Sequence, residues 1–275
     1  MAYSRSVCCK PIVYEESDLT ESSVDPVAVV VGGASGIGSA VASGFADEGY
    51  RVVVADLNAG GAAEKAAELG APHSSAQVDV TDEATVAALF AQAGPVDVVV
   101  NTAGFGDFGR ITELDMERFR AVIDCCLTGA VIVAKHAGRT LRDGGSLVSI
   151  TSLNARQAAS GMSAYCSAKA GLAMFTQVAA LEFAPRNIRV NAVSPGFVHT
   201  PLTELVTLAP GVLEDYLENS PLGRVGTAQD VADAVLFLCS DKASWLTGEV
   251  LDLNGGAHLK RYPDVLGHID RMASA

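Results

Sequence analysis

Tyr165 and Lys169 are four residues apart, and Ser152 lies thirteen residues before the tyrosine. On a helix, positions four apart lie on one face about one turn from each other. A phenol beside an ammonium group ionises more easily, because the positive charge favours the phenolate. Such a tyrosine can donate or accept a proton at an oxygen atom near neutral pH, as hydride-transfer chemistry requires. Pairs of this kind also occur on ordinary helices, so a second motif must support the interpretation.

That second motif is a glycine-rich segment, Gly32–Gly38, between the apolar run Val27–Val31 and a predicted helix at Ser39–Glu48. A strand, a glycine turn and a helix in this order let the backbone approach a pyrophosphate, at which the helix N-terminal amides point. A glycine cluster without these neighbours is more often an ordinary loop. Here a second apolar run follows and ends at Asp56, twenty residues after Gly36. The whole unit predicts a dinucleotide site.

Asp56 also predicts which dinucleotide binds. An acid at this place can accept hydrogen bonds from the adenosine ribose hydroxyls. Its carboxylate would repel a 2′-phosphate, and no Arg or Lys lies within Gly33–Ser39 or directly after Asp56 to receive one. The pattern therefore favours NAD over NADP. The alternative is a solvated acid at the end of a strand.

Taken together, the motifs resemble those of the short-chain dehydrogenase/reductase family, in its form of roughly 250 residues. The resemblance runs from about Val27 to Ala257. The matching pieces, in the family's order and at its spacing, are Gly32–Gly38, Asp56, Asp79-Val80, Asn101–Gly104, Ser152, Tyr165–Lys169, Pro195-Gly196 and Thr200. Any one of these pieces is weakly specific, whereas the set is highly specific.

The resemblance implies a role for each of the three reactive residues. Tyr165 is the expected general acid/base. Lys169 is expected to hold the nicotinamide ribose and to lower the pKa of the tyrosine. Ser152 is expected to orient the substrate oxygen and stabilise its charge. The implied cofactor contacts are Gly32, Ser35, Gly36, Ile37, Gly38, Asp56, Leu57, Asp79, Val80, Asn101, Ala103, Gly104, Tyr165, Lys169, Pro195, Gly196, Val198 and Thr200.

The sequence departs from the family pattern at three positions. Val31 replaces a threonine, and Thr102 replaces an asparagine. Cys126 stands where the family has a catalytic asparagine that helps to hold a water in a proton relay to the lysine, and a thiol is a weak hydrogen-bond partner. We expect a less efficient relay rather than an inactive protein. A redox pair of Cys125 and Cys126 is the poorer interpretation, because adjacent cysteines on a helix point in different directions.

Two functions follow as alternatives. The favoured one is an NAD-dependent dehydrogenase/ketoreductase that acts on a secondary alcohol or ketone. The other is an NAD-binding sensor or scaffold of the same fold with weak or no turnover, which the cysteine at position 126 motivates. The presence of Ser152, Tyr165 and Lys169 argues against a sensor, which has no need of all three.

Composition sets limits on partners and compartment. The chain has 275 residues and a net charge of −13, so we expect no nucleic-acid partner. We find no apolar run of the ~20 residues that span a bilayer, nor the apolar stretch of a secretory signal, and we expect no membrane association. The five histidines and six cysteines lack ligand spacing, so no metal is expected. A reduced, cytoplasmic protein is the simplest prediction.

The fold that must position these residues is a single α/β domain over residues 25–257, with an N-terminal extension at 1–24 and a C-terminal extension at 258–275. Continuous β-branched runs predict strands buried on both faces of a parallel sheet. Alternation with helices predicts a Rossmann-like, doubly wound, seven-stranded sheet flanked by helices on both faces, with ligands at the carboxyl ends of its strands. The predicted strands are Val27–Val31, Arg51–Asp56, Ala76–Asp79, Val96–Asn101, Ser146–Thr151, Arg189–Val193 and Val250–Leu253.

Three segments are expected to contact the substrate: Phe105–Gly109, Leu153–Ser160 and a lid at Thr200–Glu218. Their apolar residues include Phe105, Phe108, Leu202, Leu205, Val206 and Leu208, and the lid contains no Arg or Lys. This predicts an apolar pocket. His199 is a candidate for its mouth.

Assembly is predicted from the resemblance. Family tetramers use the helices around Asp115–Gly138 and Ala164–Phe183, so a homotetramer is expected. The apolar residues of the C-terminal extension are expected to enlarge that interface or to cover a neighbouring subunit's site; they are Leu259, Tyr262, Val265, Leu266 and Ile269.

Overall fold

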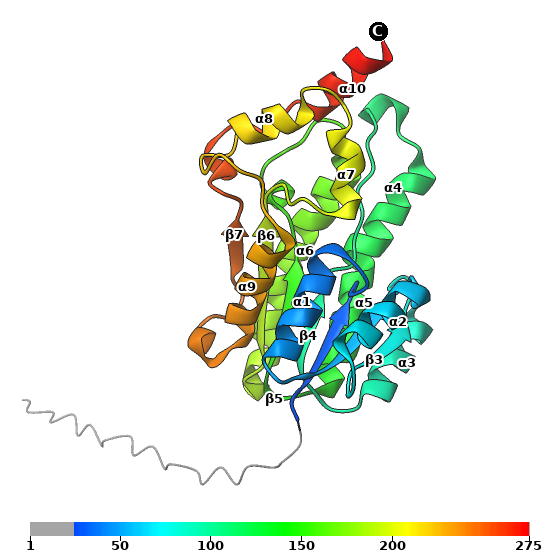
Figure 1. Ribbon diagram of the computed structural model, residues 1–275, viewed down its shortest axis with the longest axis vertical. Coiled ribbons are helices and arrows are strands. Elements are labelled where there is room, and N and C mark those ends of the chain that lie inside the picture. Colours follow the sequence, from blue (N-terminus) through cyan, green and yellow to red (C-terminus); the bar gives the residue numbers. More distant parts are fainter. Residues whose placement is uncertain (1–24, 275) are drawn as a thin grey trace, which may run out of the picture.

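The computed structural model describes residues 25–274 and shows one seven-stranded sheet in which every neighbouring pair of strands is parallel. The strand order is β3-β2-β1-β4-β5-β6-β7, so the order reverses between β1 and β4 (Figure 1). The strands are β1 (Val27–Val31), β2 (Arg51–Asp56), β3 (Ser74–Gln77), β4 (Val96–Asn101), β5 (Leu141–Ile150), β6 (Arg189–Pro195) and β7 (Val250–Leu253). The predicted Rossmann-like fold is confirmed.

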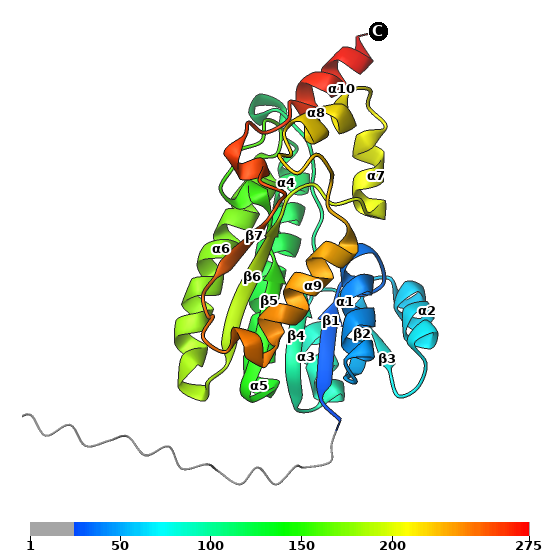
Figure 2. The same cartoon turned by 60° about the vertical axis from the view of Figure 1, so that its left-hand side comes forward.

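Helices cover both faces of this sheet, as Figure 2 shows. On one face lie α1 (Gly36–Asp47), α2 (Ala59–Leu69) and α9 (Ala228–Cys239), which pack on Val30 and its neighbours. On the other lie α3 (Glu83–Ala93), α5 (Gly129–Thr140) and α6 (Ser163–Phe183), which pack on Val29 and its neighbours. Successive strand residues point to opposite faces, so valines in an unbroken run are buried on both sides. Short 3₁₀ turns lie at Ile111–Glu113, Leu153–Ala155, Ala184–Arg186, Asp241–Ala243 and Ala257–Leu259.

Several predicted boundaries are wrong. The third strand is Ser74–Gln77 rather than Ala76–Asp79, because Val53 pairs with Ser74 and the register places Gln77 opposite Asp56. This strand is at the edge of the sheet and pairs with a neighbour on one side only, so polar residues are tolerated in it. The apolar run on which the prediction relied therefore did not mark its position. The fifth strand begins at Leu141 and ends at Ile150. Helix α1 begins at Gly36, inside the glycine turn, since the Ser39 amide donates to the Ser35 carbonyl at 3.1 Å.

One long helix runs through α4 (Met116–Ile123), a π-helical turn η2 (Asp124–Thr128) and α5. By length and composition alone, the helix Met116–Thr140 could cross a membrane, although no apolar run of that length was expected from the sequence. In this fold, α4 packs along α6 and α5 packs along α3. These contacts with other helices of the domain bury part of its apolar surface.

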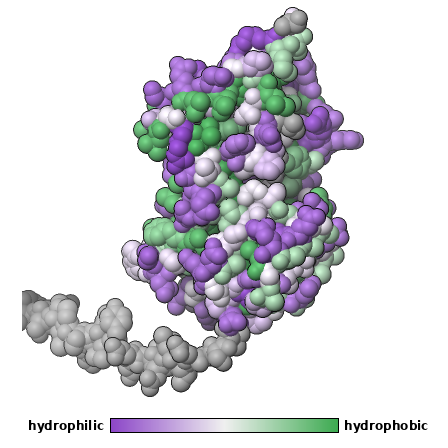
Figure 3. Space-filling model, in the orientation of Figure 1, coloured by the Kyte–Doolittle hydropathy of each residue, from purple (hydrophilic) through white to green (hydrophobic). Residues whose placement is uncertain are grey.

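A lid stands above the carboxyl ends of the strands. It consists of α7 (Pro201–Thr207), α8 (Val212–Glu218) and α10 (Val265–Ala273), all at the same end of the molecule in Figures 1 and 2. Hydrophobic surface gathers at this end in Figure 3, and exposed apolar side chains of the lid and its flanks include Leu208, Leu213, Leu217, Leu222 and Leu259.

The C-terminal extension folds back onto its own chain. Val265 is buried in a small core with Ala209 and Val212, and Tyr262 and Ile269 pack against it. Leu266 lies against Gly161. Within the chain, these residues therefore pack against α8, the residues before it and the turn before α6, and their contact with a second subunit stays a prediction.

Candidate active site

The glycine turn is shaped by backbone contacts that exclude side chains. Gly32 and Gly36 have φ angles of +81° and +52°, in the region that favours glycine. A Cβ atom on Gly38 would lie 2.0 Å from the Gly32 carbonyl oxygen. The Thr102 hydroxyl lies 2.9 Å from the Val31 carbonyl oxygen and 3.0 Å from that of Gly32, so it ties the turn to the end of β4. A hydroxyl thus holds this turn although Val31 itself carries none.

Asp56 is fixed at the end of β2 beside this turn. Its Oδ2 accepts a hydrogen bond of 3.0 Å from the Ala34 amide, and its Oδ1 accepts one of 2.9 Å from the Asn58 amide. The carboxylate is half-buried and borders the groove above the glycine turn. The position fits a group that meets ribose hydroxyls.

The groove itself has a volume of about 340 Å³. Twelve predicted cofactor residues line it: Gly32, Ser35, Gly36, Ile37, Gly38, Asp56, Leu57, Asp79, Val80, Ala103, Gly104 and Thr200. Val31, Val78, Thr102, Phe105, Cys125 and Pro201 line it as well, and the predicted set of contacts did not contain them. Asn101 does not line the groove; it is buried behind it, where its Oδ1 accepts from the Ala103 amide at 3.2 Å.

Tyr165 and Lys169 both lie on α6, where the expected helical turn places them together. The Lys169 Nζ is 5.5 Å from the centre of the Tyr165 ring. It donates a hydrogen bond of 2.8 Å to the Ile150 carbonyl oxygen at the end of β5, and the side chain is buried. Ser152 follows two residues after Ile150, and its hydroxyl accepts a hydrogen bond of 3.1 Å from the Asn154 amide. The sheet and α6 thus bring the three reactive residues into one region.

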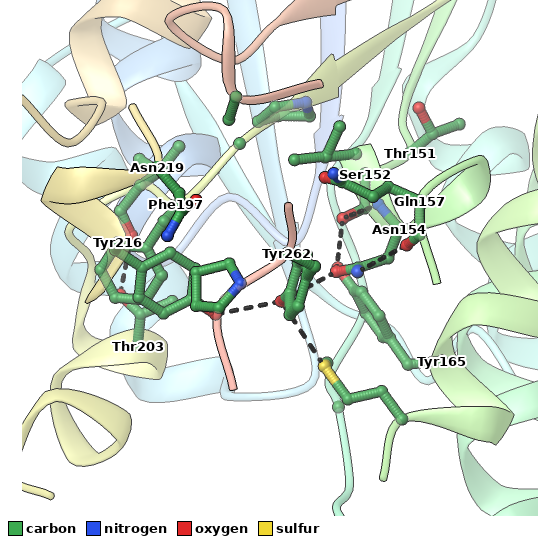
Figure 4. A pocket seen from close by; sticks show the side chains of 18 of the residues that line it. Thr151, Ser152, Asn154, Gln157, Tyr165, Phe197, Thr203, Tyr216, Asn219 and Tyr262 are labelled. Carbon is green, nitrogen blue, oxygen red and sulfur yellow. Dashed lines mark hydrogen bonds between the residues drawn. The ribbon is translucent and has the colours of Figure 1, made fainter. Parts of the chain in front are cut away.

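Ser152 and Tyr165 line a second cavity of about 210 Å³, beside the groove (Figure 4). Ile37 and Thr200 line both spaces, so the cavity adjoins the groove. The walls are largely apolar and aromatic, with Phe108, Phe197, Tyr216 and Tyr262 among them. Pro195, Gly196 and Val198, which were predicted to contact the cofactor, line this second cavity instead of the groove.

The predicted substrate segments reach the second cavity only in part. Phe108, Asn154, Gln157, Thr203 and Tyr216 line the cavity as part of those ranges, whereas Phe105 lines the groove. Leu208 is exposed and lines neither space, and His199 is likewise exposed and lines neither. The side chains of Leu202, Leu205 and Val206 lie outside the described part of the structure.

Nine lining residues were not predicted from the sequence: Ile150, Thr151, Met162, Phe197, Asn219, Ala257, Arg261, Tyr262 and Pro263. Phe197 lies inside the segment between Pro195 and Thr200, and Asn219 directly follows the predicted lid, so both ranges could have been drawn to include them. Nothing in the sequence indicated that the C-terminal residues Arg261, Tyr262 and Pro263 line the cavity. Tyr262 was noticed for its apolar character but assigned to an interface.

Cys126 lies beside the reactive lysine. A Cβ atom on Gly104 would be 3.3 Å from both the Cys126 Sγ and the Lys169 Nζ. The cysteine is buried in the π-helical turn η2, a kind of turn frequent at functional sites, and its thiol donates to the Phe105 carbonyl oxygen at 3.2 Å. The neighbouring Cys125 thiol and the Lys169 ammonium lower the pKa of Cys126. The contact with Cys126 and burial raise the pKa of Cys125.

Other clusters give no competing site. Among residues 25–274, no group of three or more His, Cys, Asp or Glu side chains could hold a metal ion. Cys125, Cys126, Cys166 and Cys239 are free thiols.

Comparison with known proteins agrees with this geometry. A family model described as enoyl-(acyl carrier protein) reductase matches residues 32–258. Cis-4-hydroxycyclohexanecarboxylate dehydrogenase of Sinomonas cyclohexanicum is 39% identical over 245 residues, which cover 86% of this chain and 98% of that protein. The 3-oxoacyl-[acyl-carrier-protein] reductase of Homo sapiens is 37% identical over 243 residues, 86% of this chain and 99% of that protein.

A solved structure agrees as well. That of a short-chain type dehydrogenase/reductase from Mycobacterium ulcerans matches with a TM-score of 0.86 and 33% identity, over 90% of this chain and 94% of that one. The relatives are dehydrogenases and reductases that match along nearly their whole length. The chain therefore belongs to the short-chain dehydrogenase/reductase family of oxidoreductases.

Proposed function

We propose that the protein is an NAD(H)-dependent dehydrogenase/ketoreductase that interconverts a secondary alcohol and a ketone. The observation that carries the proposal is the junction of the two spaces. Ile37 and Thr200 border both the glycine-turn groove and the cavity that Ser152 and Tyr165 line. A cofactor in the groove and a substrate in the cavity would therefore meet beside the reactive tyrosine.

The residues of the groove fit a dinucleotide without a 2′-phosphate. The glycine turn leaves backbone amides at the start of α1 free of bulky side chains, which suits a pyrophosphate. The Asp56 carboxylate borders the groove where an adenosine ribose would lie. None of the described residues that line the groove is Lys or Arg, so a 2′-phosphate would meet a negative charge without a compensating positive one. These features support NAD over NADP.

Each reactive residue has a distinct task in this proposal. The nicotinamide supplies the hydride chemistry when it is bound. Tyr165 takes the proton from the alcohol oxygen in oxidation and returns it to the carbonyl oxygen in reduction. Ser152 donates a hydrogen bond to the same oxygen and so orients it. Lys169, held by the Ile150 carbonyl, keeps a positive charge near the tyrosine and has further N–H donors for the ribose hydroxyls.

The substrate is proposed to be compact and largely apolar. The cavity of about 210 Å³ is walled largely by apolar and aromatic groups, with polar side chains such as Asn154, Gln157 and Arg261 between them. The Sinomonas relative is, by its name, a dehydrogenase of a compact cyclic alcohol that also carries a carboxylate. A cyclic secondary alcohol is therefore the first class to test.

The test begins with calorimetric titration of the protein with NADH and, separately, with NADPH. We expect tighter binding of NADH. Absorbance at the nicotinamide band then follows oxidation of a panel that contains cyclohexanol, cis-4-hydroxycyclohexanecarboxylate and a 3-hydroxybutyryl thioester. Preference for NADPH would overturn the role given to Asp56, and binding without turnover of any panel alcohol would favour the sensor.

We also propose that the protein forms homo-oligomers through α6. Met174, Val178 and Leu181 are exposed at helical spacing along this helix, so they share one face that a second copy could cover. Size-exclusion chromatography with light scattering measures the molar mass of the assembly, and a homotetramer is expected. A monomer at micromolar concentration would contradict this part of the proposal.

A further inference from the structure

A chain of hydrogen bonds crosses the substrate cavity and ends at Ser152. The Tyr216 hydroxyl lies 3.0 Å from the Tyr262 hydroxyl, which in turn donates to the Asn154 Oδ1 at 3.3 Å (Figure 4). The Ser152 hydroxyl donates to the same Asn154 Oδ1, also at 3.3 Å. The members come from α8, from the C-terminal extension and from the turn after β5, so residues distant in sequence share one amide oxygen.

Asn154 governs where the proton of Ser152 points. Its backbone amide donates to the serine oxygen, and its side-chain oxygen accepts from the serine hydroxyl. The Asn154 Nδ2 donates to the Gln157 carbonyl at 3.1 Å, which fixes the orientation of the amide group. In the proposed reaction, Ser152 must turn this same proton toward the substrate oxygen. Whatever weakens the bond between Ser152 and Asn154 therefore assists the serine.

Tyr262 is suited to weaken that bond. A phenol is a stronger hydrogen-bond donor than an aliphatic alcohol, so it competes well for the Asn154 oxygen. Burial raises the pKa of Tyr262, and burial likewise raises the pKa of Tyr216, so both remain protonated donors at neutral pH. With the phenol in place, Asn154 holds the serine proton less tightly.

A buried acid of the lid holds Tyr262 in this position. Asp215 on α8 accepts hydrogen bonds from the Arg261 guanidinium at 2.5 Å, from the Asp264 amide at 2.9 Å and from the Asn219 amide group at 2.9 Å. Its partners Arg261 and Asp264 lie on either side of Tyr262 in sequence. Helix α8 therefore holds the C-terminal extension at residues near Tyr262 on both sides in sequence.

We propose that Tyr262 is a positioning residue for Ser152, acting through Asn154, and that Asp215 holds it in place. The proposal rests on the proposed function, in which Ser152 donates to the substrate oxygen. It assigns a task in the reaction to the C-terminal extension of the same chain. It also predicts that the loss of the Tyr262 hydroxyl changes turnover rather than substrate binding.

A double-mutant cycle with Ser152→Ala and Tyr262→Phe tests the proposal. The steady-state probe is the panel alcohol with the highest kcat/KM, with NAD as the second substrate. Tyr262→Phe keeps the ring and should lower kcat roughly fivefold, as expected for one net hydrogen bond, with KM unchanged. In the Ser152→Ala background, the same change should lower kcat by less than about twofold, because the residue through which it acts is gone.

Two control variants separate this effect from others. Tyr216→Phe removes a hydroxyl one step further along the chain, and should lower kcat less than Tyr262→Phe does. Tyr50→Phe changes a tyrosine that packs against Phe45 of α1, and should leave kcat unchanged. Calorimetric NADH affinity equal to that of the wild type shows that each variant is folded.

The outcomes separate a failure of the proposed function from a failure of the role given to Tyr262. If Ser152→Ala keeps the wild-type kcat, or no panel alcohol is oxidised, the proposed function fails and this inference fails with it. If Ser152→Ala is impaired but Tyr262→Phe lowers kcat equally in both backgrounds, the positioning role is wrong while the function stands. A rise in KM at constant kcat would likewise show that Tyr262 contacts the substrate instead.

Discussion

Lys169 reaches from α6 to the end of β5, where its Nζ donates a hydrogen bond of 2.8 Å to the Ile150 carbonyl oxygen. This contact fixes the ammonium group at the strand end from which Ser152 follows, and 5.5 Å from the centre of the Tyr165 ring. A buried lysine is stable only when its charge is partnered. The backbone carbonyl provides one partner, and the ammonium group has two further N–H donors, which the proposed function assigns to the cofactor.

The first prediction concerns the hydroxyl of Tyr165. Tyr165→Phe should lower kcat by about 10²- to 10⁴-fold, the usual contribution of a general acid/base, while the NADH dissociation constant stays near that of the wild type. Steady-state kinetics and calorimetry measure the two quantities. Tyr50→Phe, a tyrosine outside both the groove and the cavity, serves as the matched control. Equal turnover of Tyr165→Phe and wild type would eliminate the catalytic assignment and leave the sensor.

The second prediction concerns the charge of Asp56. Asp56→Asn should weaken NADH binding by roughly tenfold or more, since a hydrogen bond to a charged group is lost, and should strengthen NADPH binding because a repulsive charge is removed. Titration with both cofactors gives the ratio of their dissociation constants. Asp47→Asn removes an equal charge from the exposed end of α1 and should leave the ratio unchanged. An unaltered ratio in Asp56→Asn would contradict the NAD assignment.

The third prediction concerns the close approach at Gly38. Gly38→Ala should abolish NADH binding, because its Cβ would lie 2.0 Å from the Gly32 carbonyl oxygen and the turn must open. Overpacking of this kind also costs about 1–3 kcal/mol of stability. Gly60→Ala in α2 is the control, since its Cβ meets Asn58 at an ordinary 3.5 Å. Thermal melting and calorimetry together decide the outcome, and retained NADH affinity in Gly38→Ala would refute the role of the turn.

The fourth prediction concerns Cys126. Its thiol is a weak hydrogen-bond partner beside Lys169, so Cys126→Asn should raise kcat by improving the proton relay. Cys239→Ala, at the end of α9, is the control for loss of a thiol and should not change kcat. A rate in Cys126→Asn that is equal to or below that of the wild type would show that the thiol does not limit turnover.

The fifth prediction concerns the cap of α9. Thr227 and Asp230 form a reciprocal capping box, so Thr227→Ala should cost about 1 kcal/mol of unfolding free energy. The Arg224 guanidinium, which donates two bonds of 2.7 Å, and the Thr227 amide hold the pKa of Asp230 well below its usual range.

The pH dependence of this cap follows from that lowered pKa. A lowered folded-state pKa contributes its full stability above the unfolded value of about 4, and this contribution is lost progressively as the pH falls from there through the folded-state pKa of Asp230. Urea unfolding at pH 7 and pH 2 should therefore show a smaller destabilisation by Asp230→Asn at pH 2 than at pH 7. Asp233→Asn, on the exposed side of the same helix, should show little change at either pH. Equal destabilisation of Asp230→Asn at both pH values would contradict the assignment.

The edge strand shows one limit of reasoning from sequence. The apolar character of Val78 and Ala76 suggested Ala76–Asp79, but the strand is Ser74–Gln77, because an edge strand is selected by backbone pairing more than by burial. The glycine turn, by contrast, was recognised correctly, because φ angles and close approaches at Gly32 and Gly38 require glycine whatever surrounds them.

The sequence by itself determined the strands of the central sheet, the glycine turn, Asp56 at a strand end and the helical spacing of Tyr165 and Lys169. These features depend on local periodicity and on the backbone preferences of neighbouring residues. Only the tertiary structure decided that Tyr262 meets Asn154, 108 residues away, and that Asp215 binds Arg261, 46 residues away. Such contacts depend on how the lid and the C-terminal extension pack over the sheet, and no short-range pattern in the sequence encodes that packing.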